Sequence, residues 1–240
     1  MANLKTYQEM LSQPWGKILY ELIFAQLTDI KNQDVLDFGA GFGITAQQLS
    51  QKNRVTAVEP NADMLWADDK QTFQKIHGSL EALGKMDSEL FDTIICHNVL
   101  EYVPERDRQS YFRAFERLLK PGGKLSLIKH NQVGKVMQAV VFDNKVNLAL
   151  DLLDGKAKIA HSFGHAHTYT LDDLAEMTSL HIENYRGLRT FYALQPNTFK
   201  TEENWIDNLL KAELAVADLQ PYKDIAFLQH VTLRKTLKTD

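Results

Sequence analysis

Hydrophobic residues recur at helical spacing over the first thirty residues, and this pattern predicts helix there. Pro14 either separates two helical pieces or begins the second one. Further along, short apolar runs alternate with helical segments. The apolar runs predict strands at residues 35–38, 54–59, 73–77, 91–97, 124–129, 181–194 and 225–233. Helices are predicted at residues 44–49, 61–70, 104–119 and 202–219, and another opens at residue 170.

Strands that alternate with helices predict an α/β fold with a parallel, doubly wound sheet and right-handed crossovers. A length of 240 residues fits one such domain. Residues 131–170 interrupt the alternation, and their hydrophobic positions suggest one or two helices. We interpret residues 1–240 as one domain, in which 1–30 forms an N-terminal helical cap and 131–170 a lid or substrate-binding insertion.

The most informative motif is DFGAGFG at residues 37–43, where a predicted strand ends and three glycines follow on alternate positions. Glycine lets a backbone turn tightly and approach a ligand closely. The helix that follows offers N–H groups to an anion, either a pyrophosphate or a carboxylate. The dinucleotide-binding fingerprint requires its third glycine at position 44, which is Ile44 here, so the spacing argues against a dinucleotide.

A second acid ends the next predicted strand. Glu59 follows Asp37 by 22 residues, a place from which a carboxylate can accept both hydroxyl groups of a ribose. Asn61 is the predicted N-cap of the following helix, and Met64 is expected to face an adenine. Open α/β sheets bind ligands at the carboxyl ends of their strands. The residues predicted at such ends are Asp37, Glu59, Gly78 and His97.

The pattern D-x-G-x-G-x-G resembles motif I of the class I S-adenosylmethionine-dependent methyltransferases. Residues 91–103 and 118–125 resemble the family motifs that follow the fourth strand and precede the fifth. The resemblance covers most of the chain. It implies S-adenosylmethionine as the cofactor and a Rossmann-like, seven-stranded, mostly parallel sheet. The last strand of that sheet is expected to be antiparallel and to insert beside the fifth.

The resemblance also implies roles for individual residues. In this family the glycine loop holds the methionine part of the cofactor, with the acid near its ammonium group. The turn at residues 77–81 is the usual place for adenine contacts. The expected cofactor-binding residues are Asp37, Gly39, Ala40, Gly41, Glu59, Pro60, Met64, Gly78, Ser79, Leu80, His97 and Asn98.

His97 and Glu101 are the expected catalytic residues. A carboxylate acceptor needs no base, whereas a hydroxyl or amine acceptor gains about 10²–10⁴-fold from one. Three further histidines, His161, His165 and His167, are weaker candidates for this role. No cysteine or carboxylate follows them at ligand spacing, so we expect no metal site.

Composition indicates which binding partners and which cellular compartment to expect. The net charge of −4 is unlike that of a protein that binds nucleic acid through bulk charge, although residues 120–160 hold seven lysines against three acids. The single cysteine, Cys96, excludes an internal disulfide and suits a reducing cytosol. We find no leader-like opening and no run of 18 apolar residues, and therefore expect a cytoplasmic protein with no membrane and no disulfide-linked partner.

Within the family the chain is most similar to the bacterial tRNA 5-carboxymethoxyuridine methyltransferases, through HNVLEYV at 97–103, PGGKLSL at 121–127 and HVTLRK at 230–235. Those enzymes esterify a carboxylate on the wobble uridine, a group that arginine binds well. Where we would expect that arginine, residues 227–229 read FLQ. The expected substrate is therefore either tRNA or a small molecule. The alternatives are an NAD-binding oxidoreductase and a non-catalytic, cofactor-binding regulator.

Overall fold

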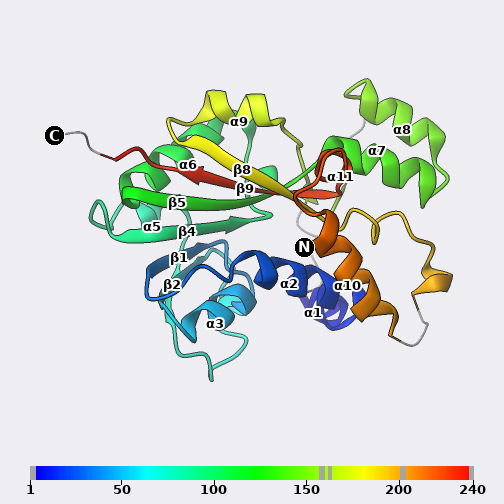
Figure 1. Ribbon diagram of the computed structural model, residues 1–240. Helices are drawn as coiled ribbons and strands as arrows, with labels where there is room; N and C mark the ends of the chain where they lie inside the picture. The colour runs from blue at the N-terminus through cyan, green and yellow to red at the C-terminus, as the bar shows by residue number, and fades with distance from the viewer. Residues whose placement is uncertain (1–3, 157–159, 162–163, 201–203, 238–240) are drawn as a thin grey trace. The chain divides into compact units, whose positions relative to one another are not determined.

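The computed structural model describes residues 4–156, 160–161, 164–200 and 204–237 (Figure 1). The chain divides into two compact units, each built from three segments. Unit 1 consists of residues 1–26, 129–170 and 185–230. Unit 2 consists of residues 27–128, 171–184 and 231–240. None of the described helices is long and apolar enough to cross a membrane.

A seven-stranded sheet has the order β3-β2-β1-β4-β5-β9-β8, which confirms the predicted strand count and the place of the last strand beside the fifth (Figure 1). The strands are β1 (Asp34–Phe38), β2 (Arg54–Glu59), β3 (Gln74–His77), β4 (Phe91–His97), β5 (Leu119–His130), β8 (His181–Leu188) and β9 (Leu228–Arg234). The pairs β1–β2, β1–β4, β2–β3 and β4–β5 are parallel, whereas β9 runs antiparallel. A separate antiparallel ladder joins β6 (Ala160–His161) and β7 (Gly164–His165).

The helices of unit 2 follow the strands in alternation, as the fold class predicts. They are α3 (Ile44–Ser50), α4 (Ala62–Leu65), α5 (Leu80–Leu83), η1 (Leu100–Tyr102), α6 (Glu105–Leu118) and α9 (Leu171–Met177). Helix α6 shows why the sequence folds this way. Glu105 and Asp107 lie in its first turn, where carboxylates interact favourably with the helix dipole. Its buried face includes Phe112 and Phe115, and the Phe115 ring packs edge-on against Phe38 of β1 at 5.4 Å.

Two predicted boundaries in unit 2 are wrong. The helix predicted over 61–70 is the single turn α4, which ends at Leu65. The strand predicted from Lys124 begins five residues earlier, at Leu119. Residues 121–123, which lie between the predicted helix and the predicted strand, belong to the strand. They form a bulge within β5, where the register jumps by five residues between partners that are only two apart on β4. Gly122 has φ of +75°, a conformation that glycine adopts without strain.

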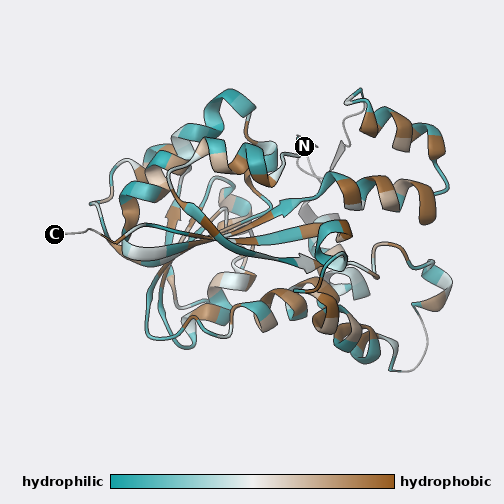
Figure 2. Cartoon of the chain, turned by 45° about the horizontal axis from the view of Figure 1, so that its top comes forward, coloured by the Kyte–Doolittle hydropathy of each residue, from teal (hydrophilic) through white to brown (hydrophobic). Residues whose placement is uncertain are grey.

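The helices of unit 1 are α1 (Leu4–Ser12), α2 (Pro14–Gln26), α7 (Gln132–Val141), α8 (Val146–Leu153), η2 (Asn197–Phe199), α10 (Trp205–Val216) and α11 (Tyr222–Ile225). Pro14 begins the second helix, as predicted. The predicted insertion contains two helices, α7 and α8, which pack through Ala139, Ala149 and Leu152. Brown, hydrophobic residues nonetheless recur along both helices in Figure 2. Large exposed side chains on them are Val133, Val140, Val141, Val146, Leu150 and Leu153.

Two predicted strands of the C-terminal half are shorter than expected. The strand predicted over 181–194 ends at Leu188, because Arg189 takes a left-handed φ of +59° that a strand cannot continue through. The strand predicted from Ile225 begins at Leu228, because residues 222–225 form α11. The helix predicted over 202–219 covers Trp205–Val216 among the described residues.

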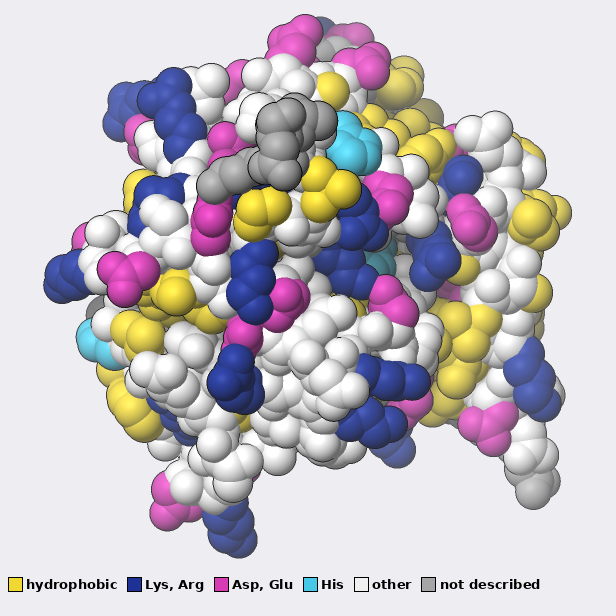
Figure 3. All heavy atoms as spheres, turned by 60° about the vertical axis from the view of Figure 1, so that its left-hand side comes forward, with side chains coloured by type: hydrophobic (Ala, Val, Ile, Leu, Met, Phe, Trp, Pro, Cys, Tyr) yellow, Lys and Arg dark blue, Asp and Glu magenta, His cyan; other side chains and the backbone are white. Residues whose placement is uncertain are grey.

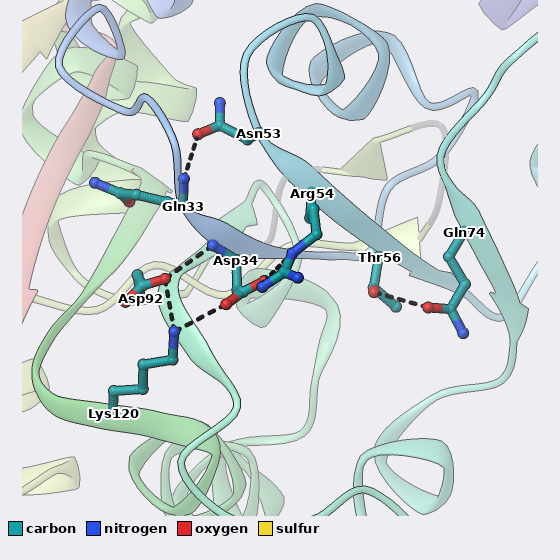
Figure 4. Close-up of polar contacts among 8 residues, drawn as sticks. All are labelled: Gln33, Asp34, Asn53, Arg54, Thr56, Gln74, Asp92 and Lys120. Atoms are coloured by element: carbon teal, nitrogen blue, oxygen red, sulfur yellow. Dashed lines mark hydrogen bonds and ion pairs between the residues drawn. The ribbon is translucent and has the colours of Figure 1, made fainter.

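The amino ends of the parallel strands are joined by a charged network (Figure 4). Lys120 Nζ lies 2.9 Å from Asp34 Oδ2 and 2.8 Å from Asp92 Oδ2. Arg54 pairs with the other oxygen of Asp34. The hydrogen bond from Lys120 holds the pKa of Asp34 below its usual value, and Asp92 and Asp34 raise the pKa of Lys120. This network ties β1, β2, β4 and β5 together at the edge of the sheet away from the predicted site.

Candidate functional site

The glycine loop lies between β1 and α3 in unit 2. Its glycines are required by the backbone conformation and by the lack of space for side chains. Gly39, Gly41 and Gly43 have φ of +74°, +57° and +71°, where other residues are strained. There is also no room for side chains. A Cβ on Gly39 would lie 2.3 Å from a methyl of Val99, and one on Gly43 would lie 2.6 Å from the Phe73 ring. The backbone of the loop therefore packs closely against Val99 and Phe73, in a way that only glycine allows.

Glu59 holds this loop from the end of β2. Its Oε2 accepts a hydrogen bond from the Gly41 N–H at 2.8 Å, and its Oε1 accepts one from the Asn61 N–H at 2.9 Å. Burial raises the pKa of this carboxyl, and the two N–H donors oppose the rise. Each carboxylate oxygen can accept more than one hydrogen bond. Glu59 can thus position the loop and still accept hydrogen bonds from a ligand.

Asp37 of β1 is a buried carboxyl group with an incomplete set of hydrogen bonds. The side chain is only 3% exposed, and Oδ2 has no hydrogen-bond partner among the described residues. Burial raises its pKa from 3.8 to about 7; a hydrogen bond from the Ala46 backbone lowers it, and the charge of Glu59 raises it further. A buried carboxylate is stable only with a cation or good donors beside it. Asp37 is therefore a buried carboxyl group whose second oxygen lacks a hydrogen-bond donor in the described part of the chain.

The adjoining turns frame the same edge of the sheet. Asn61 accepts a hydrogen bond from the Met64 N–H at 3.2 Å, which confirms it as the N-cap of α4. A Cβ on Gly41 would lie 3.2 Å from the terminal methyl of Met64, so the buried Met64 side chain packs directly against the loop. Gly78 follows β3 and donates its N–H to the Glu59 carbonyl. Ser79 and Leu80 continue this turn into α5, and Pro60 is exposed beside it.

The end of β4 brings two further predicted residues to this edge. His97 is half-buried, and its Nε2 lies 2.9 Å from the hydroxyl of Ser126 on β5. Asn98 has φ of +55°, and its side-chain oxygen is buried without a partner in the described part of the chain. Glu101 lies on η1 and is completely buried. Its charge helps to raise the pKa of the Cys96 thiol, after the larger effect of burial.

Two residues of this site were not predicted. Gln71 donates from Nε2 to the Phe42 carbonyl at 2.8 Å and so clamps the far side of the glycine loop. Ser126 orients His97. The only sequence signal for Ser126 is its place in PGGKLSL, where it alternates with buried leucines, and Gln71 has no motif around it.

The three other candidate histidines, His161, His165 and His167, are all in unit 1. The side chains of His161 and His165 lie outside the described residues, whereas His167 is half-buried. Among described residues there is no group of three His, Cys, Asp or Glu that could hold a metal ion. Cys96 is a free, buried thiol on β4.

Part of the chain matches a known domain family, and its fold matches solved structures. Residues 36–127 match the family model of a methyltransferase domain. This segment carries the glycine loop, Glu59, His97 and Ser126. The ubiquinone biosynthesis O-methyltransferase of Pectobacterium atrosepticum is 32% identical over 115 residues, which are 45% of this chain and 47% of that protein. The chain thus spans about half the length of the curated relatives it matches.

Solved structures extend the likeness to nearly the whole chain. An S-adenosylmethionine-dependent methyltransferase from Mesorhizobium loti matches with a TM-score of 0.57 and 17% identity over 93% of this chain and all of that one. The 1,6-didemethyltoxoflavin-N1-methyltransferase of Burkholderia thailandensis, solved with bound 1,6-didemethyltoxoflavin and S-adenosylhomocysteine, matches with a TM-score of 0.52 and 16% identity. The match covers 98% of this chain and 81% of that one. At these identities the likeness establishes the fold, which is that of S-adenosylmethionine-dependent methyltransferases.

Proposed function

We propose that this protein is an S-adenosylmethionine-dependent methyltransferase. The observation that carries the proposal is the buried Asp37 oxygen without a partner, set directly before a loop of three left-handed glycines. The ammonium group of the cofactor's methionine part would supply the cation that this carboxylate needs. The match of residues 36–127 to a methyltransferase domain supports this reading over an NAD-binding oxidoreductase.

We assign the cofactor-binding roles as follows. Asp37 binds the ammonium group, and the backbone of Gly39, Ala40 and Gly41 surrounds the methionine part. Glu59 accepts the ribose hydroxyls with the lone pairs that its two backbone donors leave open. The adenine ring packs against Met64. The residues assigned to the remaining cofactor contacts are Pro60, Gly78, Ser79, Leu80, His97 and Asn98.

The cofactor supplies a sulfonium methyl group that is already electrophilic, so the protein has mainly to orient the acceptor and exclude water. We propose His97 as the base for a hydroxyl acceptor, because Ser126 holds its ring at the carboxyl edge of the sheet. Glu101 was predicted to share this role. Its complete burial favours a positioning role instead, since a base must exchange a proton with the acceptor.

For the acceptor we propose an oxygen atom on a small molecule, because the curated relatives are named as O-methyltransferases of ubiquinone biosynthesis. A modified wobble uridine of tRNA is the second candidate, favoured by the motifs at 97–103 and 121–127. We propose that the insertion at 131–170 contacts the acceptor. The face shown in Figure 3 carries basic and acidic side chains side by side, which gives tRNA no extended basic surface on that face.

Calorimetric titration with S-adenosylhomocysteine tests the cofactor. Binding at micromolar concentration is expected, and no heat from a folded sample would contradict the proposal. Enhanced NADH fluorescence with no response to S-adenosylhomocysteine would instead favour the oxidoreductase. Transfer of labelled methyl from S-adenosylmethionine to fractions of a cell extract then separates an enzyme from a non-catalytic binder. Mass spectrometry of tRNA nucleosides from a deletion strain separates the two acceptors.

A further inference from the structure

The hairpin of α7 and α8 in unit 1 exposes a group of apolar side chains. The two helices are only 10 and 8 residues long, yet they carry six of the fourteen large hydrophobic side chains that are exposed in the described part of the chain. These six are Val133, Val140, Val141, Val146, Leu150 and Leu153. Single exposed hydrophobic residues are normal, whereas a group of this kind marks a surface that another molecule covers.

The other sides of the hairpin are packed. The two helices meet through Ala139, Ala149 and Leu152. Helix α7 also packs against α11, where a Cβ on Gly134 would lie 2.3 Å from the carbonyl oxygen of Ala226. The exposed apolar side chains are therefore additional to those that hold the hairpin together and fix it in unit 1.

The exposed side chains of the two helices lie on one side of the hairpin. The hydrogen bond from Gln132 Nε2 to the Leu152 carbonyl, 2.8 Å long, joins the start of α7 to the end of α8, so the helices are antiparallel. At 100° per residue, the exposed apolar stripe of each helix is rotated by about 100° from the residues packed between the helices. In an antiparallel pair these two rotations point to the same side. The six side chains thus form one surface, the hairpin face.

The hairpin face is large enough for a protein interface. Six half-exposed Val and Leu side chains present on the order of 400 Å² of apolar surface, within the range of the largest patches on ordinary monomers. A two-fold pairing buries the same patch on both copies, together with the polar residues at its edge. The total reaches about 1,000 Å², the lower limit for a specific interface.

The charges of α8 are reversed relative to its helix dipole. Lys145 is the N-cap and its side chain caps no N–H group, while Asp151 lies in the last turn. Asp154 follows as the C-cap and pairs with Lys156 at 2.6 Å. Acids are favourable at the start of a helix and bases at its end, so Lys145 and the two aspartates oppose the dipole. This arrangement lowers the stability of the helix in a single chain.

We propose that a second copy of this chain covers the hairpin face, with α8 of one protomer antiparallel to α8 of the other. In that arrangement Lys145 of each protomer lies near Asp151 and Asp154 of the other. The charges that oppose the dipole within one helix are then paired between two helices, whose dipoles are antiparallel as well. The two hairpins form a four-helix bundle with the apolar stripes inside it.

A lipid surface is another possible occupant of an apolar helical face. Helices that lie on membranes carry many lysines and arginines, which attract anionic headgroups. Residues 132–156 have no excess of basic side chains, because three lysines oppose three aspartates: Lys135, Lys145 and Lys156 against Asp143, Asp151 and Asp154. The balanced charge favours the second copy.

Sedimentation velocity of the full-length protein between about 1 and 100 µM tests the dimer. An interface of this size should give a dissociation constant in the micromolar range, so dimer should predominate at the upper concentration. Leu150→Glu puts a charge on the hairpin face and should weaken the dimer at least about 10-fold. The matched control is Leu219→Glu, at a leucine outside the hairpin that is 53% exposed against 55% for Leu150. Monomer throughout, or equal weakening in both variants, would overturn the proposal.

Exchanging charges tests the antiparallel arrangement. Lys145→Glu alone, and Asp151→Lys combined with Asp154→Lys, each bring like charges together in their own homodimers and should weaken them. A mixture of the two proteins restores both sets of charge pairs. The mixed dimer should therefore form at least about 5-fold more tightly than either homodimer. No preference for the mixed dimer would overturn this arrangement.

Vesicles of phosphatidylethanolamine and phosphatidylglycerol separate the two occupants. The wild type is expected to stay in solution when the vesicles are sedimented. Binding that Leu150→Glu abolishes, by a protein that is monomeric in solution, would assign the hairpin face to a lipid surface and overturn the proposal. The dimer does not depend on the proposed function, because the hairpin lies in unit 1 and the proposed cofactor residues lie in unit 2. A monomeric wild type that binds S-adenosylhomocysteine would contradict the dimer alone.

Discussion

Each unit contains a buried ionisable side chain with an unpartnered polar atom among the described residues, an acid in unit 2 and an arginine in unit 1. In unit 2 a buried carboxyl group, Asp37, has one oxygen without a partner among the described residues, and the charge of another acid, Glu59, raises its pKa further. In unit 1 a buried cation, Arg189, has an Nε without a partner among the described residues, the charge of Glu213 acts on it, and a second cation, Lys200, lies over the same Tyr192 ring. The difference is in the protein's response: burial shifts the pKa of Asp37 to about 7, where it can become neutral, and that of Arg189 to about 10, where it stays charged. An acid can lose its buried charge by binding a proton, whereas Arg189 keeps its charge and has the carboxylate of Glu213 to interact with.

The largest expected effect concerns the stability of the ligand-free protein. Burial raises the pKa of Asp37 from 3.8 to about 7. Between these values the folded state keeps a proton that the unfolded state releases, so wild-type stability falls as pH rises through this window. Asp37→Asn does not titrate and should exceed the wild type above pH 7 by as much as about 4 kcal/mol. Urea unfolding at pH 5 and pH 8 measures this, and a difference that does not grow with pH would contradict it.

The same substitution should weaken the cofactor site. Asp37→Asn removes the charge proposed to pair with an ammonium group, and affinity for S-adenosylhomocysteine should fall about 100-fold. Asp63→Asn is the matched control, because Asp63 is an exposed acid on α4 in the same unit. Calorimetry at pH 8 makes the comparison. Equal losses in the two variants would show that Asp37 has no special part.

Glu213→Gln tests the carboxylate that interacts with Arg189. The three backbone N–H groups of residues 190–192 would lose a charged acceptor, and stability should fall by about 2 kcal/mol. S-adenosylhomocysteine binding in unit 2 should stay unchanged. Chemical denaturation and calorimetric titration give the result. A loss confined to cofactor binding would reverse the roles of the two units.

Lys120→Met should have the smallest effect. The lysine bridges Asp34 and Asp92 in a half-exposed network, so stability should fall by no more than about 1 kcal/mol. The lowered pKa of Asp34 means that its share is present above the ordinary value near 3.8 and is lost as pH falls below it. Cofactor affinity should not change. A change in affinity would mean that the amino edge of the sheet is coupled to the site.

The sequence predicts the strands and the glycine loop of unit 2 well because these features are local. Glycine spacing and the positions of Asp37 and Glu59 at strand ends follow from residues that are close along the chain. Boundaries are predicted less well where tertiary structure decides, as for the bulge at 121–123. Arg189 could not be predicted, because Trp15, Glu213 and Phe227 reach it from distant parts of the sequence. A buried arginine and an exposed one look the same in a sequence.

The division into units has a practical consequence for fragment work. The chain passes from one unit to the other five times, and β5, β8 and β9 each contain residues of both. A single cut or truncation therefore cannot release either unit as one continuous polypeptide. The segment 36–127, which matches a methyltransferase domain, ends inside β5 and would leave this strand unfinished. Expression of that segment by itself should yield an aggregating fragment, so domain swaps between relatives should exchange residues 131–170 within the intact chain.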